Sequence, residues 1–98
     1  YARRRRIVLD GLESLDLPTG APNGAFYAFP DISSLGIGDE EFAERLLKDE
    51  RVAVVPGSAF GAGGRGHVRI CYAVSEEKLR EALVRIGRFV ASLKGGGR

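Results

Sequence analysis

The chain has 98 residues, of which 44% are hydrophobic and 29% charged, and its formal net charge at pH 7 is +2. This length accommodates one compact domain with a single core. No apolar run approaches the roughly 18 residues of a membrane span, and the single cysteine, Cys71, excludes an intrachain disulfide. We therefore expect a cytoplasmic protein with no membrane partner, in which Cys71 is an inert core thiol.

A run of four arginines, Arg3 to Arg6, dominates the charge balance. Removing this run would change the net charge from +2 to −2, so the basic character belongs to one segment. Such a run usually lies on a solvated helix face, and it can also bind the phosphates of a nucleic acid. We favour the solvated face and expect no nucleic-acid partner. A small α+β module that binds nucleic acid through Arg3 to Arg6 remains the alternative.

The first half of the chain predicts a helix followed by a strand. Residues 1–15 carry apolar side chains at helical spacing between charges. The chain has no methionine and begins within this helical pattern, so we expect it to be the C-terminal piece of a longer protein. A connector rich in proline and glycine follows, and residues 24–29 predict a strand that ends at Pro30.

The second half predicts a helix, two strands and a final helix. We expect Asp39 to cap a helix that buries Phe42 and Leu46, with the next acidic residues solvated near the positive end of the helix dipole. The wholly apolar run 52–55 predicts a buried strand, and residues 67–73 predict another. Ser75 is expected to cap the last helix, which has the strongest helical periodicity in the chain.

The order of these elements indicates the fold class. Helices with a single apolar stripe, alternating with short strands, favour an α+β fold. We predict a two-layer sandwich of a small, mainly antiparallel sheet with helices on one face. The order of the strands within the sheet does not follow from the sequence.

Arg69 is the most informative single residue. It interrupts a β-branched and aromatic strand, GHVRICYA at 66–73, at a position where a buried strand favours an apolar side chain. An unpaired buried charge costs several kcal/mol, as an order of magnitude. Arg69 therefore either reaches solvent or pairs with an anion.

None of the other motifs forms a complete catalytic or ligand-binding site. The glycine-rich run 61–66 matches the letters of a dinucleotide fingerprint, but a strand follows it where the mechanism requires a helix. His67 has no cysteine or carboxylate at the spacing of a metal site. We predict no catalytic, cofactor-binding or metal-binding residue within this chain.

Three segments taken together are more specific than any one motif. They are PNGAFYAFPDI at 22–32, VAVVPGSAFG at 52–61 and GHVRICYA at 66–73. In this order and spacing they resemble the C-terminal small domain of class I/II pyridoxal-phosphate-dependent aminotransferases, the aspartate aminotransferase superfamily of fold type I. The resemblance runs from Tyr1 through the last helix. It implies a small domain over residues 1–94, in which Tyr1 to about Leu15 end the interdomain helix, and a flexible tail at 95–98.

The resemblance also implies roles for two residues. In this family the arginine that corresponds to Arg69 binds the α-carboxylate of the amino-acid substrate, and Phe26 corresponds to an aromatic residue beside the substrate pocket. A guanidinium suits the first role because its planar fork of donors matches a carboxylate.

The cofactor implied by the resemblance is pyridoxal 5'-phosphate. The family's cofactor-bound lysine lies in the large domain, and Lys48, Lys78 and Lys94 lack its motif. We therefore expect this fragment alone to be inactive. We expect the intact enzyme to be a homodimer that transfers an amino group between an L-amino acid and a 2-oxo acid, with this fragment packed against its own large domain. Related C–S lyases and aminocyclopropane-carboxylate synthases remain open, as does the amino donor.

Overall fold

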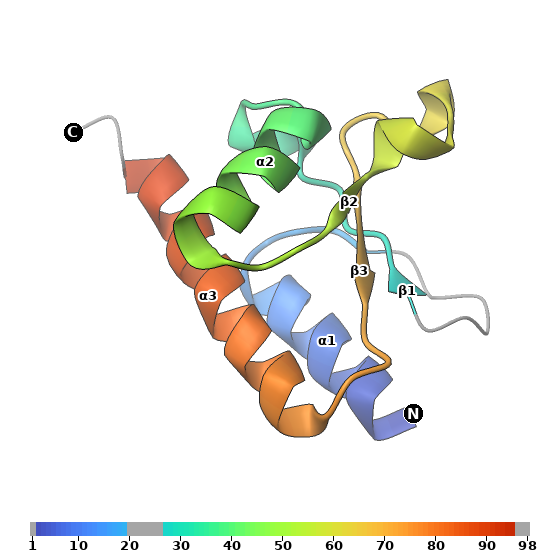
Figure 1. Ribbon diagram of the computed structural model, residues 1–98, viewed down its shortest axis with the longest axis vertical. Helices are drawn as coiled ribbons and strands as arrows, with labels where there is room; N and C mark the ends of the chain where they lie inside the picture. Colours follow the sequence, from blue (N-terminus) through green and yellow to red (C-terminus); the bar gives the residue numbers. More distant parts are fainter. Residues whose placement is uncertain (1, 20–26, 96–98) are drawn as a thin grey trace.

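Three helices pack on one face of a three-stranded antiparallel sheet in the computed structural model, which describes residues 2–19 and 27–95 (Figure 1). The helices are α1 (Ala2–Ser14), α2 (Asp39–Glu50) and α3 (Glu76–Gly95), the strands are β1 (Tyr27–Ala28), β2 (Val55–Pro56) and β3 (Val68–Cys71), and the 3-10 turns are η1 (Ser33–Leu35), η2 (Gly57–Phe60) and η3 (Ala62–Gly64). This arrangement confirms the predicted α+β sandwich.

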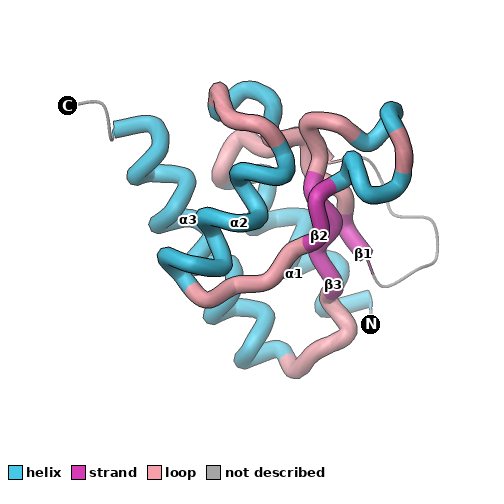
Figure 2. The backbone as a smooth tube through the Cα atoms, turned by 45° about the horizontal axis from the view of Figure 1, so that its top comes forward, coloured by secondary structure: helices cyan, strands magenta, loops and turns pink. Residues whose placement is uncertain are grey.

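The sheet has the order β1-β3-β2, so the last strand in the chain lies in the centre. Tyr27 pairs with Cys71 on one side of β3, and Val55 pairs with Arg69 on the other. Figure 2 shows the three strands close together, with α2 and α3 to one side of them. Because side chains alternate along a strand, Val68 and Ile70 point into the core while Arg69 points to the opposite face.

The core lies between the sheet and the helices. The rings of Phe42 on α2 and Phe89 on α3 meet edge to face at its centre, with 5.3 Å between their centroids. Each helix contributes the apolar stripe that its sequence predicts. The buried apolar residues around these rings are Val8, Leu12, Leu17, Ala28, Ile32, Leu46, Val68, Ile70, Tyr72, Leu79, Ile86 and Val90.

Most predicted helix boundaries agree with the structure. Ser75 precedes α3, and its Oγ accepts a hydrogen bond from the Lys78 N–H at 3.2 Å, which confirms the predicted cap. The last residue of α3 is Gly95, and the rest of the expected tail, 96–98, lies outside the described residues, as do Tyr1 and the segment 20–26. No helix in the described part of the chain is long and apolar enough to cross a membrane.

Two predictions about burial were wrong. The apolar run 52–55 is not a buried strand, because β2 begins only at Val55 and forms one edge of the sheet, where Ala53 and Val55 are exposed. Cys71 is exposed and not a core thiol, because the alternation along β3 places it on the same face as Arg69.

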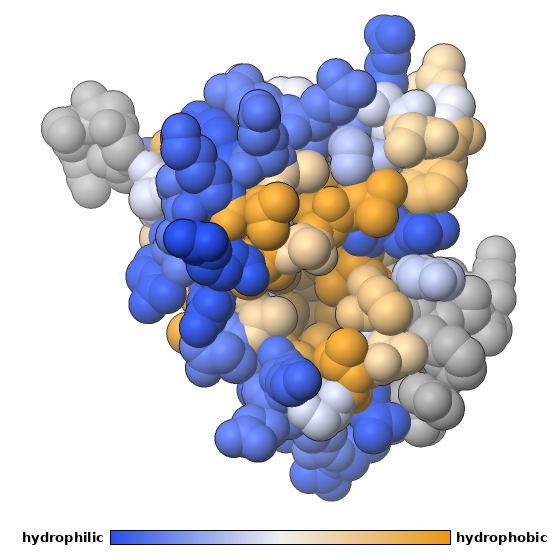
Figure 3. Space-filling view, in the orientation of Figure 1, coloured by the Kyte–Doolittle hydropathy of each residue, from blue (hydrophilic) through white to orange (hydrophobic). Residues whose placement is uncertain are grey.

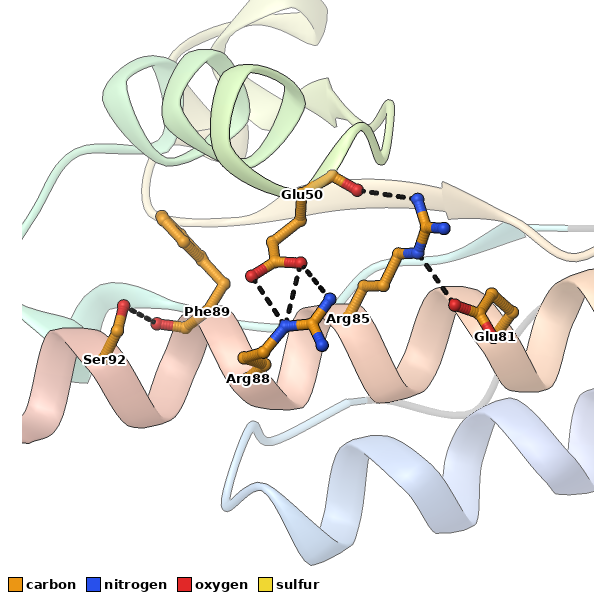
Figure 4. A network of polar contacts seen from close by, with 6 residues as sticks. All are labelled: Glu50, Glu81, Arg85, Arg88, Phe89 and Ser92. Carbon is orange, nitrogen blue, oxygen red and sulfur yellow. Dashed lines mark hydrogen bonds and ion pairs between the residues drawn. The ribbon is translucent and has the colours of Figure 1, made fainter.

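An ion-pair network fastens the C-terminal end of α2 to α3 (Figure 4). Both oxygens of the Glu50 carboxylate accept hydrogen bonds from Arg88, the shortest at 2.6 Å. Arg85 donates to the backbone carbonyl of Glu50 at 3.0 Å and pairs with Glu81 at 2.9 Å. The hydrogen bonds from Arg88 and its charge hold the pKa of Glu50 below its ordinary value of 4.5.

We expect Glu50→Gln to remove a pH-dependent part of the stability. A carboxylate with a lowered pKa in the folded state contributes stability that is present above its unfolded pKa and lost as the pH falls through its folded pKa. Thermal unfolding of the chain and of the variant, followed by circular dichroism from pH 7 to pH 2, measures this. The gap in Tm is expected at pH 7 and should close as the solution becomes acidic. An unchanged gap across this range would contradict the role of the Glu50 charge.

Candidate functional site

The face of the sheet away from the helices carries one arginine among aromatic rings. We call this cluster the open face and define it as Tyr27, Phe29, Phe60, His67 and Arg69. Tyr27 and Arg69 extend from neighbouring strands, and Phe60 is the last residue of η2, which directly follows β2. Tyr27 is 40% exposed, Phe29 37% and Phe60 52%. These large rings are thus presented to solvent on a face that no described helix covers.

The guanidinium of Arg69 is bracketed by two of these rings. Its Cζ lies 4.1 Å from the centroid of the Tyr27 ring and 4.4 Å from that of Phe60. The rings come from opposite sides of the central strand, since Tyr27 is on β1 and Phe60 follows β2. Cation–π attraction stabilises this arrangement. The guanidinium is thus held between two aromatic rings on the open face.

Arg69 lacks an anionic partner within the described residues. None of the ion pairs found there includes Arg69, and its Nε is buried without a hydrogen-bond partner. The residues outside the described ranges include no aspartate or glutamate. The planar fork of an arginine matches a carboxylate in a bidentate pair, and no described residue supplies that carboxylate. The site is therefore suited to an external carboxylate.

A second aromatic pair extends the open face. The rings of Phe29 and His67 stack with centroids 5.1 Å apart and planes inclined by 12°, and Phe60 meets Phe29 edge to face at 6.4 Å. His67 Nδ1 lies 3.2 Å from the carbonyl oxygen of Arg65, an ordinary local contact. No cluster of His, Cys, Asp or Glu that could hold a metal ion occurs in the part of the chain that the structure describes.

The glycine-rich loop between β2 and β3 supports Phe60. Gly57 and Gly64 approach so closely that a Cβ on Gly57 would lie 2.0 Å from the Gly64 carbonyl oxygen. The Gly57 N–H donates to the carbonyl of His67 at 2.7 Å. The loop leads into β3 and not into a helix, as the sequence predicts, so it lacks the helix N-terminus that the dinucleotide fingerprint requires.

Asp39 is the residue at this site that sequence reasoning missed. The predicted cap was wrong: Gly38 occupies the N-cap position, and Asp39 is buried, with 6% of the residue exposed. Its oxygens accept hydrogen bonds from the N–H groups of Ser58 at 2.8 Å and Gly66 at 3.3 Å. Burial raises the pKa of Asp39, but these hydrogen bonds outweigh burial, so its pKa lies below the ordinary value. The partners lie 19 and 27 residues away, and no local signal indicates them.

The remaining predicted residues lie apart from this cluster or outside the described part. Phe26 is among the undescribed residues 20–26. Lys48, Lys78 and Lys94 are exposed on α2 and α3 and do not belong to the open face. Arg3 lies on α1 and forms an ion pair with Glu76 at the start of α3.

A separate apolar groove is visible in the middle of the view in Figure 3. It lies between α3 and the segment that follows α2, and its lining includes Val52, Ile70, Val74 and Ala82. Charged residues such as Arg51 and Lys78 border it. The groove offers apolar contact but no convergent polar groups. Arg69 and the rings around it therefore remain the candidate functional site.

Comparison with known proteins shows what the chain is similar to. The family "Aminotransferase class I and II" matches residues 1–86. The chain is 49% identical to an aspartate aminotransferase of Pyrococcus abyssi over 94 residues. This aligned region is 96% of this chain and 24% of that protein. It is 48% identical over 94 residues to aromatic-amino-acid aminotransferase 2 of Thermococcus litoralis, with the same coverage.

A solved structure agrees with these sequence matches. The aromatic aminotransferase from Pyrococcus horikoshii superposes with a TM-score of 0.92 at 51% identity, over 96% of this chain and 25% of that one. The chain thus spans about a quarter of the length of the curated relatives that it matches.

Proposed function

The chain belongs to the class I and II aminotransferase family, and from this premise we propose that it is the C-terminal small domain of a pyridoxal-phosphate-dependent aminotransferase in which Arg69 binds the substrate α-carboxylate. The observation that carries this proposal is the unpaired guanidinium on the open face. A substrate carboxylate supplies the anion that no described residue provides.

The bracketing rings give this role a defined geometry. With Tyr27 and Phe60 against the guanidinium, a carboxylate approaches in the plane of the fork and accepts two parallel N–H bonds. Two bonds fix the orientation of the carboxylate as well as its position. Orientation contributes to rate because the Cα–H bond must be aligned before its proton can be removed. Phe26 is proposed to line the same pocket.

The chemistry itself is assigned to groups outside this chain. Pyridoxal phosphate, when bound, supplies an electron sink for the negative charge that develops at Cα. Lys48, Lys78 and Lys94 lie on α2 and α3 and not on the open face, so the residues that would hold that group are proposed to lie in the large domain. We propose that residues 1–94 pack against that domain in a cytoplasmic homodimer, with Tyr1 to about Leu15 ending the helix between the domains.

The proposed reaction is amino-group transfer between an L-amino acid and a 2-oxo acid. The relatives named above carry aminotransferase names, one for aspartate and others for aromatic amino acids. This supports a transferase over the related C–S lyases and synthases that also hold a substrate carboxylate.

The assignment predicts that activity requires more than this chain. The whole enzyme, supplied with pyridoxal phosphate, an L-amino acid and 2-oxoglutarate, should form glutamate, whereas the 98-residue chain under the same conditions should form none. Chromatographic detection of glutamate measures both. Turnover by the 98-residue chain, or elimination of the side chain by the whole enzyme in place of amino transfer, would contradict the assignment.

A further inference from the structure

A buried carboxylate connects the start of α2 to the loop that carries Phe60. Asp39 is the one buried charged side chain among the described residues. It forms none of the ion pairs found there, and its oxygens instead accept the backbone N–H groups of Ser58 and Gly66. Bonds from N–H groups to an ionised carboxylate are among the stronger hydrogen bonds in proteins.

These two N–H groups lie at opposite ends of the loop. Ser58 belongs to η2, the turn that ends at Phe60, and Gly66 immediately precedes His67 and the central strand. This side chain therefore adds to the backbone hydrogen bond from Gly57 to His67 in holding the turn against the strand that carries Arg69. A second side-chain hydrogen bond between α2 and this turn, from Ser58 Oγ to Glu40 at 3.3 Å, is exposed and longer.

From this geometry we infer that Asp39 is a positioning residue for the substrate-carboxylate site, because it holds η2 so that the Phe60 ring stays against the Arg69 guanidinium. The inference rests on the proposed role of Arg69. Asp39 itself contacts neither the guanidinium nor the substrate. It acts by holding Ser58, and so the turn that ends at Phe60.

The substitution Asp39→Asn tests this chain of contacts. An amide offers one oxygen in place of two, so either the Ser58 or the Gly66 N–H would face an NH2 group. The turn should then loosen, and Phe60 should leave the guanidinium. In the whole enzyme we expect KM for the amino acid to rise about tenfold with kcat changed less than twofold, since one buried bond to a charged acceptor is lost.

A double-mutant cycle separates positioning from general destabilisation. If Asp39 acts through Arg69, Asp39→Asn should raise KM in the natural background and add little in an Arg69→Ala background. Phe60→Ala removes an exposed ring and should reproduce both results, so the inference stays testable even if Asp39→Asn fails to fold. Glu50→Gln is the matched control, since it also converts a hydrogen-bonded carboxylate on α2 to an amide, but at the far end of the helix. It should leave KM unchanged.

The outcomes distinguish this inference from the proposed function. An equal KM increase in both backgrounds, or an unchanged KM for Phe60→Ala, overturns the positioning role while the assignment of Arg69 stands. If Arg69→Ala itself leaves KM unchanged, the proposed function fails, and this inference fails with it.

Discussion

Replacement of Arg69 by alanine should lower kcat/KM of the whole enzyme for its amino-acid substrate by about 30-fold to several thousand-fold. This corresponds to a loss of roughly 2–5 kcal/mol in transition-state stabilisation. The reason is the loss of a bidentate charged pair together with the orientation that it imposes. Steady-state kinetics at saturating cofactor measures the effect. Arg69→Lys should recover only part of it, because an ammonium keeps the charge but lacks the planar fork.

The matched control for this prediction is Arg65→Ala. Arg65 is an exposed arginine four residues earlier, so its removal changes the net charge equally without touching the bracketed guanidinium. Its kcat/KM should stay within about twofold of the natural enzyme. Similar losses for both variants would show that the effect is one of general charge, and would remove Arg69 from the site.

The loop that supports Phe60 should tolerate no side chain at Gly57 or Gly64. A Cβ on Gly57 would lie 2.0 Å from the Gly64 carbonyl oxygen, and a Cβ on Gly64 would lie 2.1 Å from that of Gly57. Both contacts involve backbone atoms, so the loop itself must move. We expect Gly57→Ala or Gly64→Ala to destabilise the chain by about 3 kcal/mol, which lowers Tm by about 10–20 °C for a chain of this size.

Gly63→Ala provides the control within the same loop. Nothing lies within 4 Å of a Cβ at this position, so alanine there should change Tm by no more than a few degrees. Thermal unfolding of the variants, followed by circular dichroism, measures the differences. A Gly57→Ala chain as stable as Gly63→Ala would contradict the close approach of the two backbone segments.

The sequence predicted the open face only in part. From the sequence, Arg69 either reaches solvent or pairs with an anion, and alternation along β3 places it on the face opposite Val68 and Ile70. The same alternation should have predicted an exposed Cys71, but the apolar character of the strand suggested a buried thiol. Periodicity determines which residues share a face, whereas the exposure of that face depends on where the helices pack.

Long-range contacts account for the rest. The apolar run 52–55 suggested two-sided burial, but an edge position leaves Ala53 and Val55 exposed. Asp39 follows the pattern of a helix cap, and only the return of the chain at Ser58 and Gly66 gives it other partners. Such contacts join residues far apart along the chain, and local propensity contains no information about them.

The most direct test of the central claim compares a carboxylate with its uncharged isostere. Calorimetry on the whole enzyme gives Kd for hexanoate and for hexanamide, which differ in charge but hardly in shape. We predict that the natural enzyme binds hexanoate roughly 30-fold more tightly, from two charge-assisted bonds, and that Arg69→Ala abolishes this preference. A preference that survives in Arg69→Ala would show that another group binds the carboxylate.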